Sequence, residues 1–120
     1  TNNYELIEGM KIVNRGFLII KPKVAFFEWS NKQTETEVDF NETDEVEGSI
    51  FLIDEDFFEI EPVIEQNFKK ILKHELSMVT EDTAAWPEKL TMETFLDFFS
   101  YDFGSFVIDL EKSDLKAEKM

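Results

Sequence analysis

"KIVNRGFLIIKPK", residues 11–23, is the stretch that decides the fold. Its centre, Phe17–Ile20, is apolar at every residue, which is typical of a strand that is buried on both faces. We therefore predict one strand over 11–21, with Gly16 permitting a bulge and Pro22 ending the ladder. Residues 22–33 fit either a hairpin partner or a helix with proline in its first position, and Asn31 and Lys32 near the end favour the helix.

The rest of the chain predicts two more strands and two more helices. "SIFLI", 49–53, is a second apolar strand, and Pro62 suits the first turn of a long helix with an apolar stripe. That stripe consists of Ile64, Phe68, Ile71, Leu72, Leu76 and Val79. Thr91 is expected to cap a helix over 92–103 that ends at a left-handed Gly104. Its buried face would hold Met92, Phe95, Leu96 and Phe99, and "SFVIDLE", 105–111, would form the last strand.

These elements predict a single α+β domain over residues 1–120. We expect a sheet of about three strands with three helices packed on it, in the order strand, helix, strand, helix, helix, strand. The two apolar strands should lie centrally, and the strand that contains Asp109 nearer an edge. Residues 1–11 would be an arm or an extra strand, and residues 112–120 a loose tail.

The composition excludes several classes of protein. The chain has no cysteine, which removes disulfides and thiolate chemistry, and its N-terminus, "TNNYELIEG", does not resemble a secretion signal. No apolar run is longer than four residues, so no membrane span is expected. We therefore predict a cytoplasmic protein without membrane association.

The net charge of −15 is unevenly distributed. Residues 33–61 hold 12 of the 27 acidic residues and no basic one. Within them, segment 34–48 predicts an acidic face, either a hydrated loop or an edge segment, formed by Glu35, Glu37, Asp39, Glu42, Asp44, Glu45 and Glu47. The segment lacks the turn glycine of a calcium loop, so no metal site is predicted. A row of carboxylates that imitates nucleic-acid phosphates is the alternative to a solvated connection.

Motifs for catalysis and cofactor binding are absent from the sequence. "HELSM" lacks the second histidine of a zinc-protease motif, and the glycines are too far apart to cradle a phosphate. We predict no catalytic residues and no cofactor, and the excess of acid disfavours nucleic acid as a partner. His74, the single histidine, should lie exposed, opposite the apolar stripe of its helix. The candidate binding residues are Asn14, Arg15, Lys23, Trp29, Trp86 and Asp109.

Several motifs resemble a family of small, acidic, uncharacterised bacterial proteins of unknown function. The resemblance spans about residues 12–110 and rests on "NRGFLIIKPK" followed by Trp29, then "KHELSM", "WPEKLT", "FLDFF" and "SFVIDL". Members of that family have an aromatic residue and a histidine before the serine, where this chain has Phe103–Gly104. The resemblance implies an α+β fold and no mechanism.

Together these observations favour a non-catalytic interaction or regulatory protein with a protein partner. Two alternatives stay open: an acidic inhibitor that occupies a basic groove of its partner, and a small enzyme that uses two carboxylates. The sequence does not determine the oligomeric state.

Overall fold

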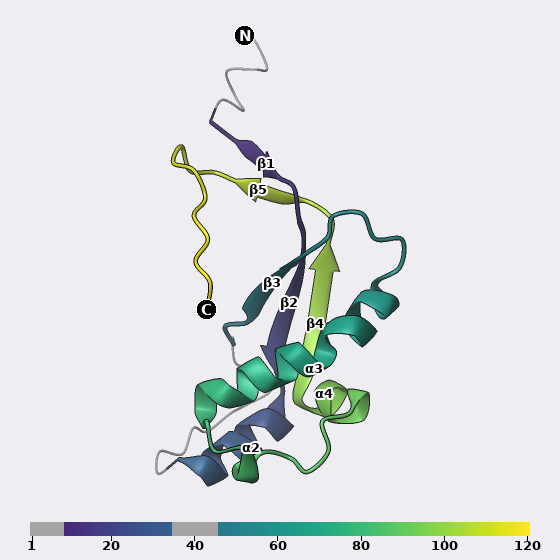
Figure 1. The fold of residues 1–120 in the computed structure, drawn as a ribbon, viewed down its shortest axis with the longest axis vertical. Coiled ribbons are helices and arrows are strands. Elements are labelled where there is room, and N and C mark those ends of the chain that lie inside the picture. Colours follow the sequence, from purple (N-terminus) through teal and green to yellow (C-terminus); the bar gives the residue numbers. More distant parts are fainter. Residues whose placement is uncertain (1–8, 35–45) are drawn as a thin grey trace.

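The computed structural model describes residues 9–34 and 46–120, and Figure 1 shows how their elements are arranged. The predicted α+β class is confirmed: the described residues form three α-helices, a three-stranded antiparallel sheet and a separate two-stranded sheet. In chain order the elements are β1 (Lys11–Val13), β2 (Gly16–Pro22), α2 (Val24–Gln33), β3 (Ser49–Ile53), α3 (Ile60–Val79), the 3₁₀ turn η1 (Thr83–Ala85), α4 (Met92–Phe98), β4 (Phe99–Gly104) and β5 (Val107–Asp109).

Strand β2 is the centre of the three-stranded sheet, as its apolar sequence predicts. The strand order is β3–β2–β4, and both pairings are antiparallel. In the register, Ile19 lies opposite Ile50 of β3 and opposite Asp102 of β4. The apolar strand β3 was expected to be central but lies at an edge.

The single strand predicted over 11–21 is wrong, because the chain bends at Asn14–Arg15 between β1 and β2. Strand β1 leaves the main sheet and pairs with β5, placing Lys11 opposite Asp109 and Ile12 opposite Ile108. The Asp109 strand therefore belongs to a separate two-stranded ribbon, which projects from the end of the molecule opposite α2 and α4 (Figure 1).

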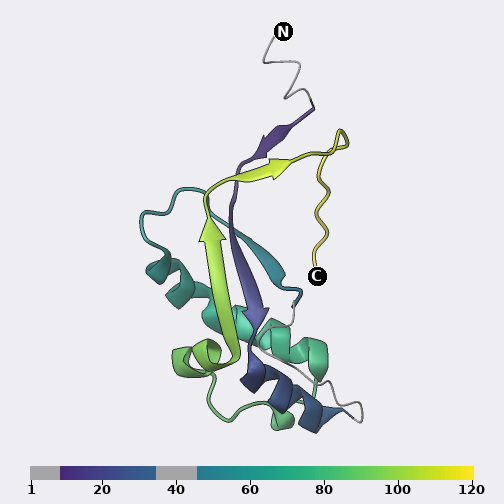
Figure 2. The ribbon, with the colours of Figure 1, turned by 180° about the vertical axis from the view of Figure 1, so that it is seen from behind.

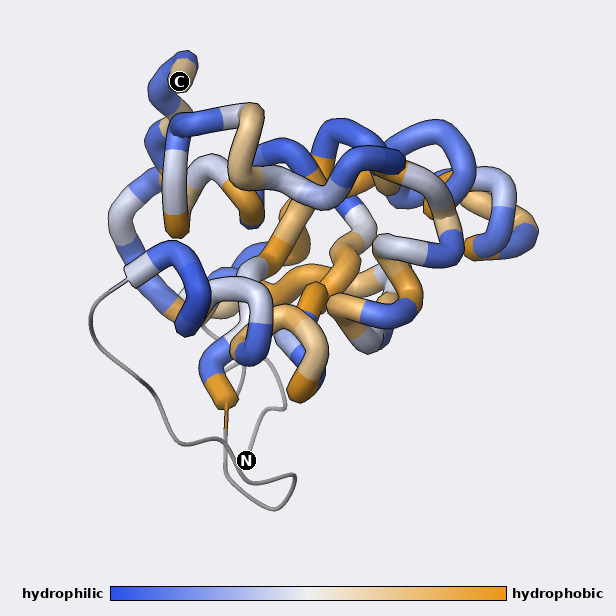
Figure 3. Tube along the Cα trace, turned by 90° about the horizontal axis from the view of Figure 1, so that it is seen from below, coloured by the Kyte–Doolittle hydropathy of each residue, from blue (hydrophilic) through white to orange (hydrophobic). Residues whose placement is uncertain are grey.

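Helix α3 packs its apolar stripe across one face of the sheet (Figure 1). Ile64, Ile71, Leu72 and Leu76 of the predicted stripe are buried, and Phe68 and Val79 pack against them half-buried. They meet Leu18 and Ile20, which point from β2 to the same side. Seen from the helical end, hydrophobic segments lie mostly at the centre and hydrophilic ones at the outside (Figure 3).

Residues 24–33 form a helix, which resolves the ambiguity between helix and hairpin in favour of the helix. The proline does not take the first helical position, however. Pro22 is the last residue of β2, and Lys23, in extended geometry, precedes the helix. The Lys23 amide donates to the Phe98 carbonyl at 2.7 Å, which joins the start of α2 to the end of α4.

The helix predicted over 92–103 is correct only in its first half. Thr91 caps α4 as expected, with its hydroxyl accepting from the Thr94 amide at 3.2 Å. After Phe98 the chain becomes strand β4, because residues 99–104 complete the ladder along the second edge of β2. Leu96, predicted to be buried, is 43% exposed, whereas Phe95 and Phe99 are in the core.

Two glycines allow the strands to approach closely. A Cβ atom on Gly16 would lie 2.9 Å from the Gly104 carbonyl oxygen and 3.2 Å from that of Asp54. Gly104 does not take the predicted left-handed conformation, since Gly9 is the one described glycine with positive φ. Instead the Phe17 ring lies over Gly104, where a Cβ atom would collide with it.

Candidate functional site

The structure divides the predicted binding residues between two distant places. Asn14, Arg15 and Asp109 lie at or next to the ribbon, whereas Lys23, Trp29 and Trp86 lie around the helices at the other end. They therefore do not form one site.

At the ribbon, Asp109 holds the turn that follows β5. Its carboxylate lies 3.6 Å from the Lys11 Nζ, accepts from the Glu111 amide at 2.9 Å, and its side chain is only 11% exposed. The same ammonium donates to the carbonyls of Lys112 and Ser113 at 3.2 and 2.8 Å. A hollow of about 250 Å³ lies here, lined by Lys11, Ile12, Val13, Asn14, Asp109, Asp114 and Leu115. Asp109 and Lys11 are paired with each other and with backbone groups after β5, so this cluster stabilises the turn that follows the strand.

At the helical end, both tryptophans hydrogen-bond to backbone carbonyls. The Trp29 indole donates to Ala85 at 3.0 Å, and the Trp86 indole donates to Thr80 at 2.9 Å. Both rings are half-buried and pack against the core. The Lys23 ammonium donates to the Leu96 carbonyl at 2.8 Å. Trp29 and Lys23 thus connect α2 and the residue before it to η1 and α4, whereas Trp86 ties the segment after η1 to the end of α3.

The predicted acidic face falls mostly outside the described residues. Of its members, Glu35, Glu37, Asp39, Glu42, Asp44 and Glu45 are not described, and Glu47 is exposed just before β3. Asp54, Glu55 and Asp56 are exposed directly after the same strand. Both ends of β3 therefore carry exposed carboxylates.

His74 was predicted to be exposed, and this is wrong. Its side chain is half-buried, and its ring meets the Phe51 ring edge-on, with 5.7 Å between the centroids. The Nδ1 atom is enclosed without a hydrogen-bond partner. The helical wheel missed this contact because Phe51 comes from β3, which the wheel does not include.

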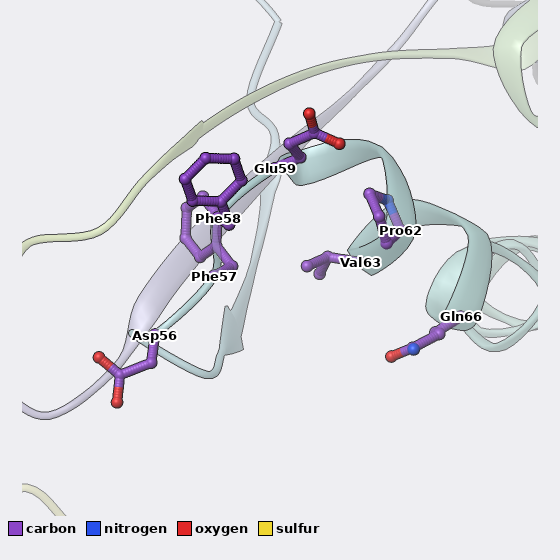
Figure 4. Close-up of a pocket in the computed structure, with 7 residues that line it drawn as sticks. All are labelled: Asp56, Phe57, Phe58, Glu59, Pro62, Val63 and Gln66. Carbon is purple, nitrogen blue, oxygen red and sulfur yellow. The ribbon is translucent and has the colours of Figure 1, made fainter.

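A second hollow of about 280 Å³ lies at the N-terminus of α3 (Figure 4). It is lined by Asp56, Phe57, Phe58, Glu59, Pro62, Val63 and Gln66. Phe58 is fully exposed, and the carboxylates of Asp56 and Glu59 point away from Val63 (Figure 4). The lining contains no basic residue, hydroxyl or thiol.

Metal ligands and membrane spans can be assessed for the described ranges only. Within residues 9–34 and 46–120, no three His, Asp or Glu side chains lie together as a metal site requires. The helices described are too short or too polar to cross a bilayer.

The feature that sequence reasoning missed is the second face of the sheet. We call it the open face and define it by Phe17, Ile19, Ile50 and Leu52, whose side chains point away from α3. Figure 2 shows β2 and β4 in front on this side, with α3 behind them. Ile50 is 65% and Leu52 52% exposed, while Phe17 and Ile19, their partners in the register, are half-buried. "SIFLI" was expected to lie centrally in the sheet, so nothing in the pattern indicated this surface.

The chain matches no known protein family, no curated protein and no solved structure. The resemblance to small acidic bacterial proteins stays a prediction.

Proposed function

We propose that this chain is a non-catalytic, cytoplasmic interaction protein that binds a protein partner through the open face. The observation that supports this proposal is the exposure of Ile50 and Leu52 on a sheet whose opposite face is closely packed. Isolated exposed apolar residues are common on protein surfaces and need no explanation. A contiguous apolar patch is different, because it is typical of a surface that a partner covers.

The two faces of the sheet differ in how deeply their side chains are buried. Leu18 and Ile20 point from β2 toward α3 and are essentially inaccessible, at 0% and 1% exposure. On the open face the cross-strand pairs Ile19–Ile50 and Phe17–Leu52 stabilise the sheet from its other side. Lys21, Ser100 and Asp102 are exposed on this side, so the apolar pairs have a polar border. An apolar centre within a polar rim is the usual anatomy of a protein interface.

The two alternative functions stay predictions. The acidic-inhibitor hypothesis depends mainly on the undescribed part of segment 34–48, and neutralising its seven carboxylates should abolish any salt-sensitive binding. The carboxylate-enzyme hypothesis needs two acids in one enclosed pocket. In the hollow at α3 the carboxylates of Asp56 and Glu59 point away from Val63. In the hollow at the ribbon those of Asp109 and Asp114 lie 3.6 and 3.9 Å from the Lys11 ammonium, which pairs with both.

Site-specific photo-crosslinking in the native cells tests the proposal. A photoreactive amino acid replaces Leu52 on the open face or, as the control, Glu88, which is exposed in the loop before α4. We expect protein adducts from position 52 that are absent from position 88 and that disappear when Ile50→Lys is added. Equal adducts from both positions, or none from position 52, would refute the proposal. Turnover of a metabolite by the purified protein, abolished by Asp109→Asn without unfolding, would also refute it.

A further inference from the structure

Among the residues that the structure describes, strand β3 lies at an edge of the sheet. It pairs with β2 on one side, and no described strand pairs with its other side. Alternate residues of an edge strand direct their N–H and C=O groups outward, where they can accept another strand. Proteins usually protect such an edge with a proline, an inward charge or a covering segment, and "SIFLI" itself contains neither proline nor charge.

The opposite edge of the sheet differs in this respect. Strand β4 has Ser100 and Asp102 on its exposed side, which makes it polar. On its other side the ring of Phe57, from the segment between β3 and α3, lies 6.1 Å from the ring of Phe103. Neither outer edge pairs with another described strand, but β3 is the one whose exposed side chains on the open face are apolar.

The two ends of β3 are negatively charged. Glu47 precedes the strand, and Asp54, Glu55 and Asp56 follow it, all exposed. A second copy of the chain paired along β3 would bring acids against acids at both ends, whether the strands ran parallel or antiparallel. Like charges placed opposite each other in a ladder destabilise it, so the charge pattern opposes self-pairing and favours a cationic partner.

On the basis of the proposed function, we propose that β3 accepts one additional strand from the partner, an extended segment with Lys or Arg at both ends. The five residues of β3 span about 16 Å, so the segment has about five residues between its basic ends. Its backbone continues the ladder of β3, and its apolar side chains on one face extend the patch formed by Ile50 and Leu52. The basic ends meet Glu47 on one side and Asp54 to Asp56 on the other.

Defined synthetic peptides test this inference. The probe is a seven-residue peptide of alternating threonine and valine with a lysine at each end. Its matched controls are the same peptide with a glutamate at each end, and the lysine-ended peptide N-methylated at every threonine and valine amide and at the amide of the last lysine, which has no backbone amide N–H left to donate. Binding is followed by the backbone amide NMR shifts of Ser49–Ile53, with those of α2 as the internal reference.

We expect the lysine-ended peptide to shift the β3 amides and each control peptide to bind at least about tenfold more weakly, because each removes the ladder or the charge match. In a Glu47→Lys, Glu55→Lys variant the preference for the lysine-ended peptide should fall, because the Glu47 end becomes positive and Asp54 and Asp56 leave the other end less negative. Glu81→Lys with Glu88→Lys changes the net charge equally at exposed acids outside β3 and should leave the preference unchanged.

Equal binding of the two charge forms, or undiminished binding of the methylated peptide, would overturn strand addition by a cationic segment. Dimerisation in sedimentation that is lost with Leu52→Lys would overturn it as well, because a second copy would then occupy this side. If no peptide binds while crosslinks from position 52 persist, this inference fails and the proposed function stands. If the crosslinks are missing too, both fail.

Discussion

The substitution Leu52→Ala should cost far less stability than Leu18→Ala, although both leucines lie in neighbouring strands of the same sheet. Leu18 points toward α3 and is 0% exposed, whereas Leu52 lies on the open face and is 52% exposed. Fully burying a leucine side chain is worth about 1.5–3 kcal/mol, so the half-buried Leu52 should lose about 1 kcal/mol. Leu18→Ala also leaves a cavity in a packed core and should lose about 3–4 kcal/mol.

Urea denaturation of the purified protein measures both losses. The fluorescence of the half-buried Trp29 and Trp86 reports the global transition, and the slope of unfolding free energy against urea should be unchanged in each variant. Equal losses for the two variants would refute the reasoning, since they would show that Leu52 is covered in solution. Repeating the titration over a range of protein concentrations would then show whether a second copy covers it.

Three further stability predictions use the same urea assay. His74→Leu should raise the unfolding free energy by about 1 kcal/mol, because it removes a buried nitrogen without a partner; an unchanged or lower value would contradict this. Gly16→Ala should lower it by about 1–3 kcal/mol, since the new methyl group would press on the Gly104 carbonyl; a neutral result would show that the strands can separate there. Thr91→Ala should lower it by about 1 kcal/mol through loss of the bond to the Thr94 amide, and Thr91→Ser should retain most of the stability; equal losses would exclude capping as the cause.

The sequence predicted those parts of the fold whose pattern is local and long. The stripe on α3 repeats over about four turns, and β2, with its four consecutive apolar residues, lies in the middle of the sheet as predicted. Residues 99–104 were misassigned because Phe95 and Phe99 fit a helical repeat, while Phe99, Tyr101 and Phe103 also alternate as in a strand. No glycine or proline separates the helical pattern from the strand pattern. Residues 99–104 form a strand because they pair with the edge of β2 that β3 does not occupy.

The candidate surface could not be predicted because it depends on strand order. Whether "SIFLI" lies at the centre or at an edge is decided by which strand pairs with β2 on its other side, and β4 was not recognised as a strand. Likewise, the contact of His74 with Phe51 and that of Asp109 with Lys11 join residues far apart in the chain. Patterns within one segment carry no information about such pairings.

The β1–β5 ribbon has a consequence for how the chain folds. The Lys11 ammonium donates to the carbonyl of Lys112, which lies 101 positions further along the chain. Closing so long a loop costs conformational entropy, and the contacts of the ribbon offset that cost only after both partners have been brought together. The ribbon should therefore form last, after α3 has packed against the three-stranded sheet, and it should open first on warming. Deuterium should accordingly enter the amides of Val13 and Val107 well before those of Leu18 and Leu72, so that this end frays while the core stays closed.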